Sequence, residues 1–231
     1  MPSQDPLDRL LREVTAFPGL NIRVASLETT RRIVEEQLEL ARHIEIARLR
    51  AEHRNLGANL HADDRDSDLF DLQQQVIHLL PKVFRGGFLI TLWSVLERCT
   101  KDVATRTGVR TGKAVSSKLF RSRPLLIAAE LAMQQTVQLP AFPDQNVRER
   151  LEQLGVVRNV LAHHDGRLSE FPPPLAGFSD EQFAALGLNV VRDYDFTYVV
   201  PTEEYLAANT ALVVGYINSL AERVFSALDP Q

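Results

Sequence analysis

Hydrophobic positions recur with a helical period over most of the chain. From about Ala25 to Asn55, apolar residues fall close to every 3.6 positions, and Arg and Glu residues three or four apart fill the other face. Ser26 or Thr29 is expected to cap the start of this helix. At about 30 residues it would be longer than most globular helices. It therefore either lies antiparallel to another helix of the same domain or pairs with a partner chain.

A second long helical pattern runs from about Asp68 to Thr107 and includes the most apolar part of the chain. Pro81 lacks an amide donor and is expected to kink or divide this helix. The adjacent glycines Gly86 and Gly87 indicate close helix packing. Two further helices are predicted, over residues 124–138 and 146–163, and Gly166 follows where a helix C-terminus favours a left-handed residue.

The pattern changes after Gly166. Residues 167–201 contain three consecutive prolines and an alternating stretch from Val190 to Val200, which predicts a loop and a short strand pair. A final helix is expected from Thr202, as N-cap, to about Leu228. The predicted fold class is therefore all-α, a helical bundle with a short irregular or β-hairpin insertion before the C-terminal helix. A single domain, 1–231, would comprise an N-terminal helical extension (1–60), core helices (68–165), the loop or hairpin (166–200) and the C-terminal helix (202–228).

Composition excludes several classes of protein. Cys99 is the only cysteine among 231 residues, so the chain cannot form an internal disulfide framework or a cysteine-rich zinc site. The first residues lack a basic-then-apolar signal pattern, and the longest strongly apolar stretch, 86–96, is about half of what a membrane span needs. We expect a soluble, cytoplasmic protein without a membrane segment. The histidines at 43, 53, 61 and 78 lack metal-ligand spacing, so neither a metal nor a cofactor is expected.

Positive charge is concentrated in one segment. The formal net charge is −4, yet residues 98–123 carry eight basic residues and one acid. Such a segment is commonly a solvated connection, but an enzyme that acts on RNA needs local positive surface for phosphates. The candidate RNA-contacting residues of this segment are Arg106, Arg110, Lys113, Lys118, Arg121 and Arg123.

Candidate chemistry lies on the helix that ends near Gly166. Asn159 and His163 are four residues apart and share a face, whereas Arg158 and His163 are separated by about 140° around the helix. Two such helices about a two-fold axis would gather two of each residue in one cleft. Histidine can pass protons near neutral pH, and arginine can bind a scissile phosphate. With the substrate 2′-hydroxyl as nucleophile, this set suits RNA cleavage without a metal.

Arg158-Asn159-x-x-x-His163, followed by Asp165-Gly166 on a late helix, resembles the Arg-x(4–6)-His motif of the HEPN superfamily. The segment 92–98 also looks like the earlier core helix of that family, in which an acidic or polar residue faces the motif. The resemblance spans about residues 83–228 and is specific only at the motif. It implies a four- or five-helix bundle, a homodimer with a composite cleft, and metal-independent endoribonuclease activity. Members include toxins, antiphage effectors and RNA-processing enzymes, some of them inactive.

By this resemblance, Arg158 and His163 are the catalytic pair and Asn159 is their polar neighbour. Glu97 is a weaker candidate, because an ion pair with Lys101 on the helix surface explains it better than a role in the site. His164 adds a second imidazole, so either His163 or His164 could face the cleft. Both histidines could instead simply complement the dipole at the helix C-terminus. Trp93 is expected in the core.

The leading hypothesis is therefore a homodimeric endoribonuclease that cuts single-stranded or loop RNA. A toxin or antiphage role, with an antitoxin or regulatory protein as partner, would follow from the family. Two alternatives remain open. The first is a catalytically inactive HEPN domain that binds RNA or a protein, and the second is a helical interaction protein that uses the helix at 25–55.

Overall fold

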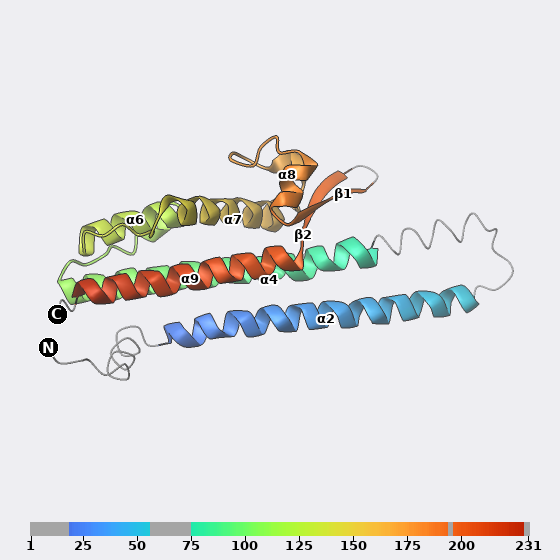
Figure 1. Ribbon diagram of the computed structural model, residues 1–231, viewed down its shortest axis with the longest axis horizontal. Helices are drawn as coiled ribbons and strands as arrows, with labels where there is room; N and C mark the ends of the chain where they lie inside the picture. Colours follow the sequence, from blue (N-terminus) through green and yellow to red (C-terminus); the bar gives the residue numbers. More distant parts are fainter. Residues whose placement is uncertain (1–18, 56–74, 194–195, 229–231) are drawn as a thin grey trace. The chain divides into compact units, whose positions relative to one another are not determined.

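The computed structural model describes residues 19–55, 75–193 and 196–228, so the loop predicted at 56–67 lies outside the described residues. The chain is mostly helical, with one two-stranded antiparallel sheet before the last helix (Figure 1). This coarser form of the predicted fold class is confirmed. The elements are α2 (Leu20–Asn55), the π-helical turn η2 (Gln75–Leu79), α4 (Leu80–Thr111), α5 (Leu119–Ser122), α6 (Leu125–Thr136), α7 (Gln145–His164), the 3₁₀ turn η3 (Leu168–Glu170), α8 (Asp180–Ala185), β1 (Leu188–Asp193), β2 (Phe196–Pro201) and α9 (Glu203–Leu228).

The chain divides into two compact units. One comprises Thr29–Ile90 and Val156–Ala208; we call it the motif unit, because it holds Arg158, His163 and the hairpin. The other comprises Met1–Glu28, Thr91–Gly155 and Asn209–Gln231 and is called the basic unit, since it holds the basic segment. Helices α2, α4, α7 and α9 each contribute to both units. The single domain stays a prediction.

Helix α2 begins earlier than its pattern predicts. It starts at Leu20, so neither Ser26 nor Thr29 is its N-cap, and the Ser26 hydroxyl donates to the Arg23 carbonyl inside the helix at 2.7 Å. The reason is that Leu20, Val24 and Leu27 are buried and extend the apolar face backwards. Farther along, two residues of the predicted apolar face are not buried: Ile33 is 47% exposed and Ile44 is 58% exposed.

Both ends of α4 follow from local backbone chemistry. The helix changes from π to α geometry at Leu80, directly before Pro81, where the sequence predicts a division. It continues past the predicted end at Thr107 to Thr111, and Gly112, whose φ is +67°, follows it. There the Lys113 amide donates to the Gly108 carbonyl at 2.9 Å, and the Gly112 amide to the Val109 carbonyl at 3.3 Å. This is a Schellman ending, which glycine favours.

Close helix packing occurs at a different glycine from the predicted pair. A Cβ at Gly86 or Gly87 would meet no described atom within 4 Å. A Cβ at Gly155 would instead lie 2.7 Å from the outer ring carbon of Trp93. In the basic unit, the half-buried Trp93 ring of α4 therefore packs against the bare backbone of α7, and the absence of a side chain at Gly155 permits this contact.

Substitutions at these glycines should have opposite effects on stability. We expect Gly155→Ala to lower the free energy of unfolding by about 1–3 kcal/mol, because the methyl group overfills the contact with Trp93. Gly86→Ala should raise it by about 0.5–1 kcal/mol, since alanine costs less entropy than glycine in a helix and has room here. Urea unfolding followed by circular dichroism measures both, and equal effects at the two sites would contradict the packing described.

The single cysteine lies in the basic unit. Cys99 on α4 is fully buried, and burial raises the pKa of its thiol. Close to it, Arg23 of α2 forms an ion pair with Asp102. In the same unit, Arg223 of α9 donates to the Ala141 carbonyl at 2.7 Å. These contacts fasten α2 and α9 to the segments beside them within the basic unit.

A hairpin follows the motif helix in the motif unit, as the alternating pattern predicts. Strand β1 pairs with β2, and Val191 lies opposite Tyr198. The end of α7 joins this sheet, because the Val199 amide donates to the Gly166 carbonyl at 3.0 Å. Strand β2 then leads directly into α9 (Figure 1), where the Tyr205 amide donates to the Thr202 hydroxyl at 3.2 Å. The predicted N-cap at Thr202 is therefore confirmed.

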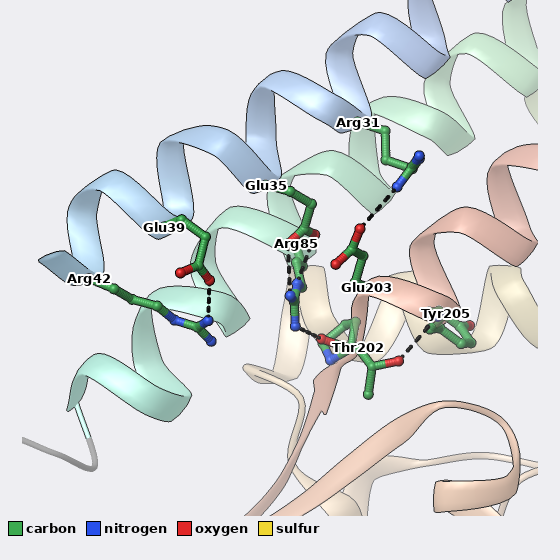
Figure 2. Close-up of polar contacts among 9 residues, drawn as sticks. Arg31, Glu35, Glu39, Arg42, Arg85, Thr202, Glu203 and Tyr205 are labelled. Atoms are coloured by element: carbon green, nitrogen blue, oxygen red, sulfur yellow. Dashed lines mark hydrogen bonds and ion pairs between the residues drawn. The ribbon is translucent and has the colours of Figure 1, made fainter.

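A buried ion pair holds three elements of the motif unit together (Figure 2). The Arg85 guanidinium on α4 donates to both carboxylate oxygens of Glu35 on α2, at 2.9 and 2.7 Å. Its third nitrogen donates to the Pro201 carbonyl at the end of β2, at 3.1 Å. Only 11% of the Arg85 side chain and 13% of the Glu35 side chain are exposed. The start of α9 is thereby fixed relative to the parts of α2 and α4 within this unit.

The π-helical turn η2 carries a histidine that should make stability depend on pH. Burial and then the charge of Arg42 lower the pKa of His78 from 6.5. As the pH falls, the unfolded chain therefore takes up a proton at His78 before the folded chain does. The free energy of unfolding falls as the pH drops through the His78 pKa of the unfolded chain, and it levels off below the pKa of the folded chain. We expect His78→Gln to flatten this dependence between about pH 7.5 and pH 5. Urea titrations across this range would show it, and an unchanged profile would contradict the assignment.

Two helical stretches, Val76–Thr111 and Glu203–Leu228, are long and apolar enough by length and composition to cross a membrane. They extend beyond the apolar stretch noted at 86–96. Core helices of soluble proteins meet the same criterion, and both stretches carry fully buried side chains, including Leu92 and Val213. They are weak evidence for a span, and the cytoplasmic location stays a prediction.

Candidate functional site

The motif occupies the last turns of α7. The helix starts where the Asp144 carboxylate accepts a hydrogen bond from the Val147 amide at 2.8 Å. Val157 and Val160 are buried on its inner face. Asp165 and Gly166 follow the helix with φ of +54° and +75°. The predicted left-handed ending at Gly166 is thus present, and it begins one residue earlier.

Arg158 and Asn159 contact each other directly. A terminal nitrogen of the Arg158 guanidinium donates to the Asn159 side-chain oxygen at 2.7 Å. The Arg158 Nε is buried and has no hydrogen-bond partner in the part of the chain that the structure describes. No described carboxylate forms an ion pair with Arg158. An amide therefore positions the guanidinium while its positive charge stays uncompensated, as binding a phosphate requires.

His163 and His164 lie at the mouth of a small hollow, which we call the histidine hollow. Its volume is about 260 Å³, and Asp165, Arg167 and Glu170 complete its lining. The two exposed imidazoles differ in their partners. The His164 Nδ1 lies 3.6 Å from a Glu170 carboxylate oxygen, whereas His163 has no ion-pair partner among the described residues. The geometry therefore favours His163 over His164 as the imidazole that is free for proton transfer.

Within one chain, the structure does not bring the whole predicted set together. Arg158 and Asn159 do not line the histidine hollow. The cation that does line it is Arg167, which lies outside the motif. The backbone of Arg167 forms an isolated antiparallel bridge with Tyr198 of β2. The signal that could have revealed Arg167 is its place directly after Asp165-Gly166, at the point where the helix meets the predicted strand pair.

A buried lysine supports the end of the motif helix and was not apparent from the sequence. Lys82 of α4 is 9% exposed, and its Nζ lies 2.9 Å from the Asp165 carboxylate. The same ammonium lies 4.4 Å from the ring centroid of Tyr198 on β2. A buried ammonium needs such partners because its desolvation is costly. Lys82 therefore ties α4, the end of α7 and β2 together beneath the histidine hollow.

The remaining candidates lie in the basic unit. Glu97 is exposed on α4, and the ion pair with Lys101 that could have explained it is not among the contacts of the described residues. Its assignment to the site stays a prediction. All six candidate RNA-contacting residues, Arg106, Arg110, Lys113, Lys118, Arg121 and Arg123, are exposed. The predicted loop that carries them is partly helical, because α4 extends to Thr111 and α5 forms at 119–122.

Metal chemistry has no evident site in residues 19–55, 75–193 and 196–228. No group of three or more His, Cys, Asp or Glu side chains in these ranges could hold an ion. The ionisable side chains that line the histidine hollow belong to histidine, arginine, aspartate and glutamate residues.

Comparison of the chain with protein-family models, with curated proteins and with solved structures gives no significant match.

Proposed function

We propose that the protein is a metal-independent endoribonuclease of the HEPN type that acts as a homodimer. The observation that carries this proposal is the pairing of two features of α7. His163 is an exposed imidazole without a carboxylate partner among the described residues, and it lines a hollow together with Arg167. Arg158, five residues earlier, is a guanidinium positioned by Asn159 and without a carboxylate partner in the described chain.

Each residue has a definite role in this reaction. The substrate 2′-oxygen attacks the adjacent phosphorus, and the bond from phosphorus to the 5′-oxygen breaks. His163 takes the 2′-hydroxyl proton or supplies the proton that the 5′-oxygen needs as it leaves. Arg158 stabilises the negative charge that grows on the phosphoryl oxygens. Asn159 is a positioning residue, because it orients the guanidinium. The products are a 2′,3′-cyclic phosphate and a 5′-hydroxyl.

The homodimer follows from the separation of these groups on one helix. Arg158 does not line the hollow of His163 in its own chain, so a second copy would supply the missing partner. Mixing Arg158→Ala and His163→Ala chains tests this directly. If the reacting pair comes from two chains, the mixture regains part of the activity that both variants lack. A mixture that forms heterodimers without regaining activity would contradict the composite site.

Cleavage of total RNA in excess EDTA tests the proposed reaction. We expect wild-type protein to cut under these conditions and to leave 2′,3′-cyclic phosphate ends, because no step needs a metal. Cleavage that requires a divalent cation, or that leaves 3′-hydroxyl ends, would contradict the mechanism. A toxin or antiphage role, an antitoxin or regulatory partner and a cytoplasmic location remain further parts of this proposal.

One observation favours an inactive domain that binds RNA or a protein. Asp165 and Glu170 line the same hollow as His163, and carboxylates repel a phosphate. The Lys82 ammonium compensates Asp165 at 2.9 Å, which leaves Glu170 as the opposing charge. If this alternative holds, wild-type protein will bind RNA without cutting it. Replacing Glu170 by glutamine should then strengthen that binding.

A further inference from the structure

The motif unit contains a second and larger hollow beside the histidine hollow. Its volume is about 590 Å³, within the range of pockets that hold small ligands. Arg167 lines both hollows. A group bound in the larger hollow therefore lies next to a group bound in the smaller one, and both hollows share Arg167 as a lining residue.

The walls of this larger hollow are rich in phenylalanine. Phe171 and Phe183 are buried, and their rings meet edge to face with centroids 5.2 Å apart. The ring centroids of Phe178 and Phe183 are 5.6 Å apart. At the rim, Phe196 is 51% exposed, and the Arg167 guanidinium lies 4.2 Å from its ring centroid. The hollow thus has a fixed apolar interior and an exposed pair of stacked planar groups at its edge.

Three elements hold these rings in place. Phe171 directly follows η3, Phe183 lies on α8 and Phe196 lies on β2. Helix α8 is anchored by a full capping box, in which Ser179 and Gln182 exchange hydrogen bonds. Strand β2 is anchored through its pairing with β1. The stacking surface is therefore built on capped and paired backbone.

The chemistry of the lining defines its occupant. Among the described residues that line it, Arg167 carries the only charged side chain, and Ser169 and Thr197 add two hydroxyl groups. Arg167 also has no carboxylate partner among the described residues. A flat, uncharged aromatic group with hydrogen-bonding edges, attached to a negatively charged group that Arg167 can bind, fits all of these features. Unpaired nucleobases are recognised in this way, by stacking on aromatic rings and on arginine planes.

We propose that this hollow binds one unpaired base of a single-stranded RNA, with the phosphate of that nucleotide on Arg167. Resting on the proposed function, this places the base next to the phosphate that His163 would act upon. The protein would then select RNA that can release a base from a duplex, and sequence preference would arise at the nucleotide held in the hollow.

Binding can be measured separately from cleavage. The probe is a fluorescein-labelled, unstructured 2′-O-methyl RNA hexanucleotide, which cannot be cut because it lacks a free 2′-hydroxyl. Its partner probe has the same backbone with abasic sites. Fluorescence anisotropy gives the affinity of each probe for wild-type protein and for Phe196→Ala. Phe225→Ala, a half-buried phenylalanine of α9 outside the lining, is the matched control.

We expect Phe196→Ala to weaken binding of the base-containing probe about tenfold and to leave the abasic probe unaffected, since the lost interaction is stacking. Phe196→Trp should retain the wild-type affinity, and Phe225→Ala should match wild type. Arg167→Ala should weaken the binding of both probes and reduce the salt dependence of their affinity by about one counterion.

Other outcomes overturn the inference. Equal binding of the two probes by wild-type protein, or equal affinities of Phe196→Ala and Phe225→Ala, would show that no base enters the hollow. Failure to bind either probe would point to a protein segment as its occupant. Base-dependent binding without cleavage of ordinary RNA would retain the hollow's role while the proposed ribonuclease activity fails. Cleavage without base-dependent binding would support the ribonuclease activity and contradict the proposed role of the hollow.

Discussion

His163→Ala is expected to lower the rate of RNA cleavage by about 10²–10⁴-fold, because proton transfer by a positioned imidazole contributes that much. Arg158→Ala should cost about 10²–10³-fold through loss of the charge that stabilises the phosphoryl oxygens. The measurement is the single-turnover rate on a defined single-stranded RNA in excess EDTA. Because neither side chain is fully buried, both variants should unfold at wild-type urea concentrations.

Matched controls make this result specific. His43→Ala removes another exposed helical histidine, and Arg150→Ala removes an exposed arginine from the same helix as the motif. Both should cut at the wild-type rate. His164→Ala should cause a smaller loss than His163→Ala, because its imidazole lies beside Glu170. If His163→Ala cuts as well as His43→Ala, the proposed catalytic role of His163 is wrong.

The largest effect on stability is expected at Arg85. Arg85→Met leaves the Glu35 carboxylate without the guanidinium that now holds both of its oxygens. Removing one partner of a buried ion pair typically costs about 3–5 kcal/mol, since the other charge stays buried. The Pro201 carbonyl also loses its donor. Urea unfolding should report this loss, and hydrogen exchange should locate it in the motif unit.

Two comparisons test the explanation for this loss. Arg48→Met removes a guanidinium whose side chain is 50% exposed and pairs with two glutamates on the same helix. Surface pairs contribute about 0–1 kcal/mol, so this variant should remain close to wild type. The double variant Glu35→Leu, Arg85→Met removes both charges and should be more stable than Arg85→Met alone. A double variant that is less stable than either single change would contradict the burial argument.

Features that depend on neighbouring residues were predictable. The alternation from Val190 to Val200 predicts the hairpin, and Thr202 before two glutamates predicts the start of α9, because pleating and capping act within a few residues. The motif was predictable for the same reason, since Arg158, Asn159 and His163 lie within two turns of one helix. The sequence also predicts the separation of about 140° between Arg158 and His163 around the helix.

Features that join distant residues were not predictable. Glu35 and Arg85 are 50 positions apart, and on its own helix Glu35 belongs to an ordinary charged face. The phenylalanines of the larger hollow lie between residues 171 and 196 without any period, in a stretch marked mainly by prolines and glycines. Lys82 likewise acquires its partners only through tertiary structure. The early start of α2 was missed because its burial depends on packing, which periodicity alone does not reveal.

The buried thiol of Cys99 can be used to measure how often the basic unit opens. A thiol reagent reacts with thiolate, and this thiol is fully buried with a raised pKa. Modification of the native protein must therefore wait for the basic unit to open. Its rate, divided by that of the urea-unfolded chain, gives the population of the open state, and each tenfold slowing corresponds to about 1.4 kcal/mol. Since Cys99 is the only cysteine, mass spectrometry reads this rate without any engineered label, and RNA added to the same reaction would show whether binding closes that unit.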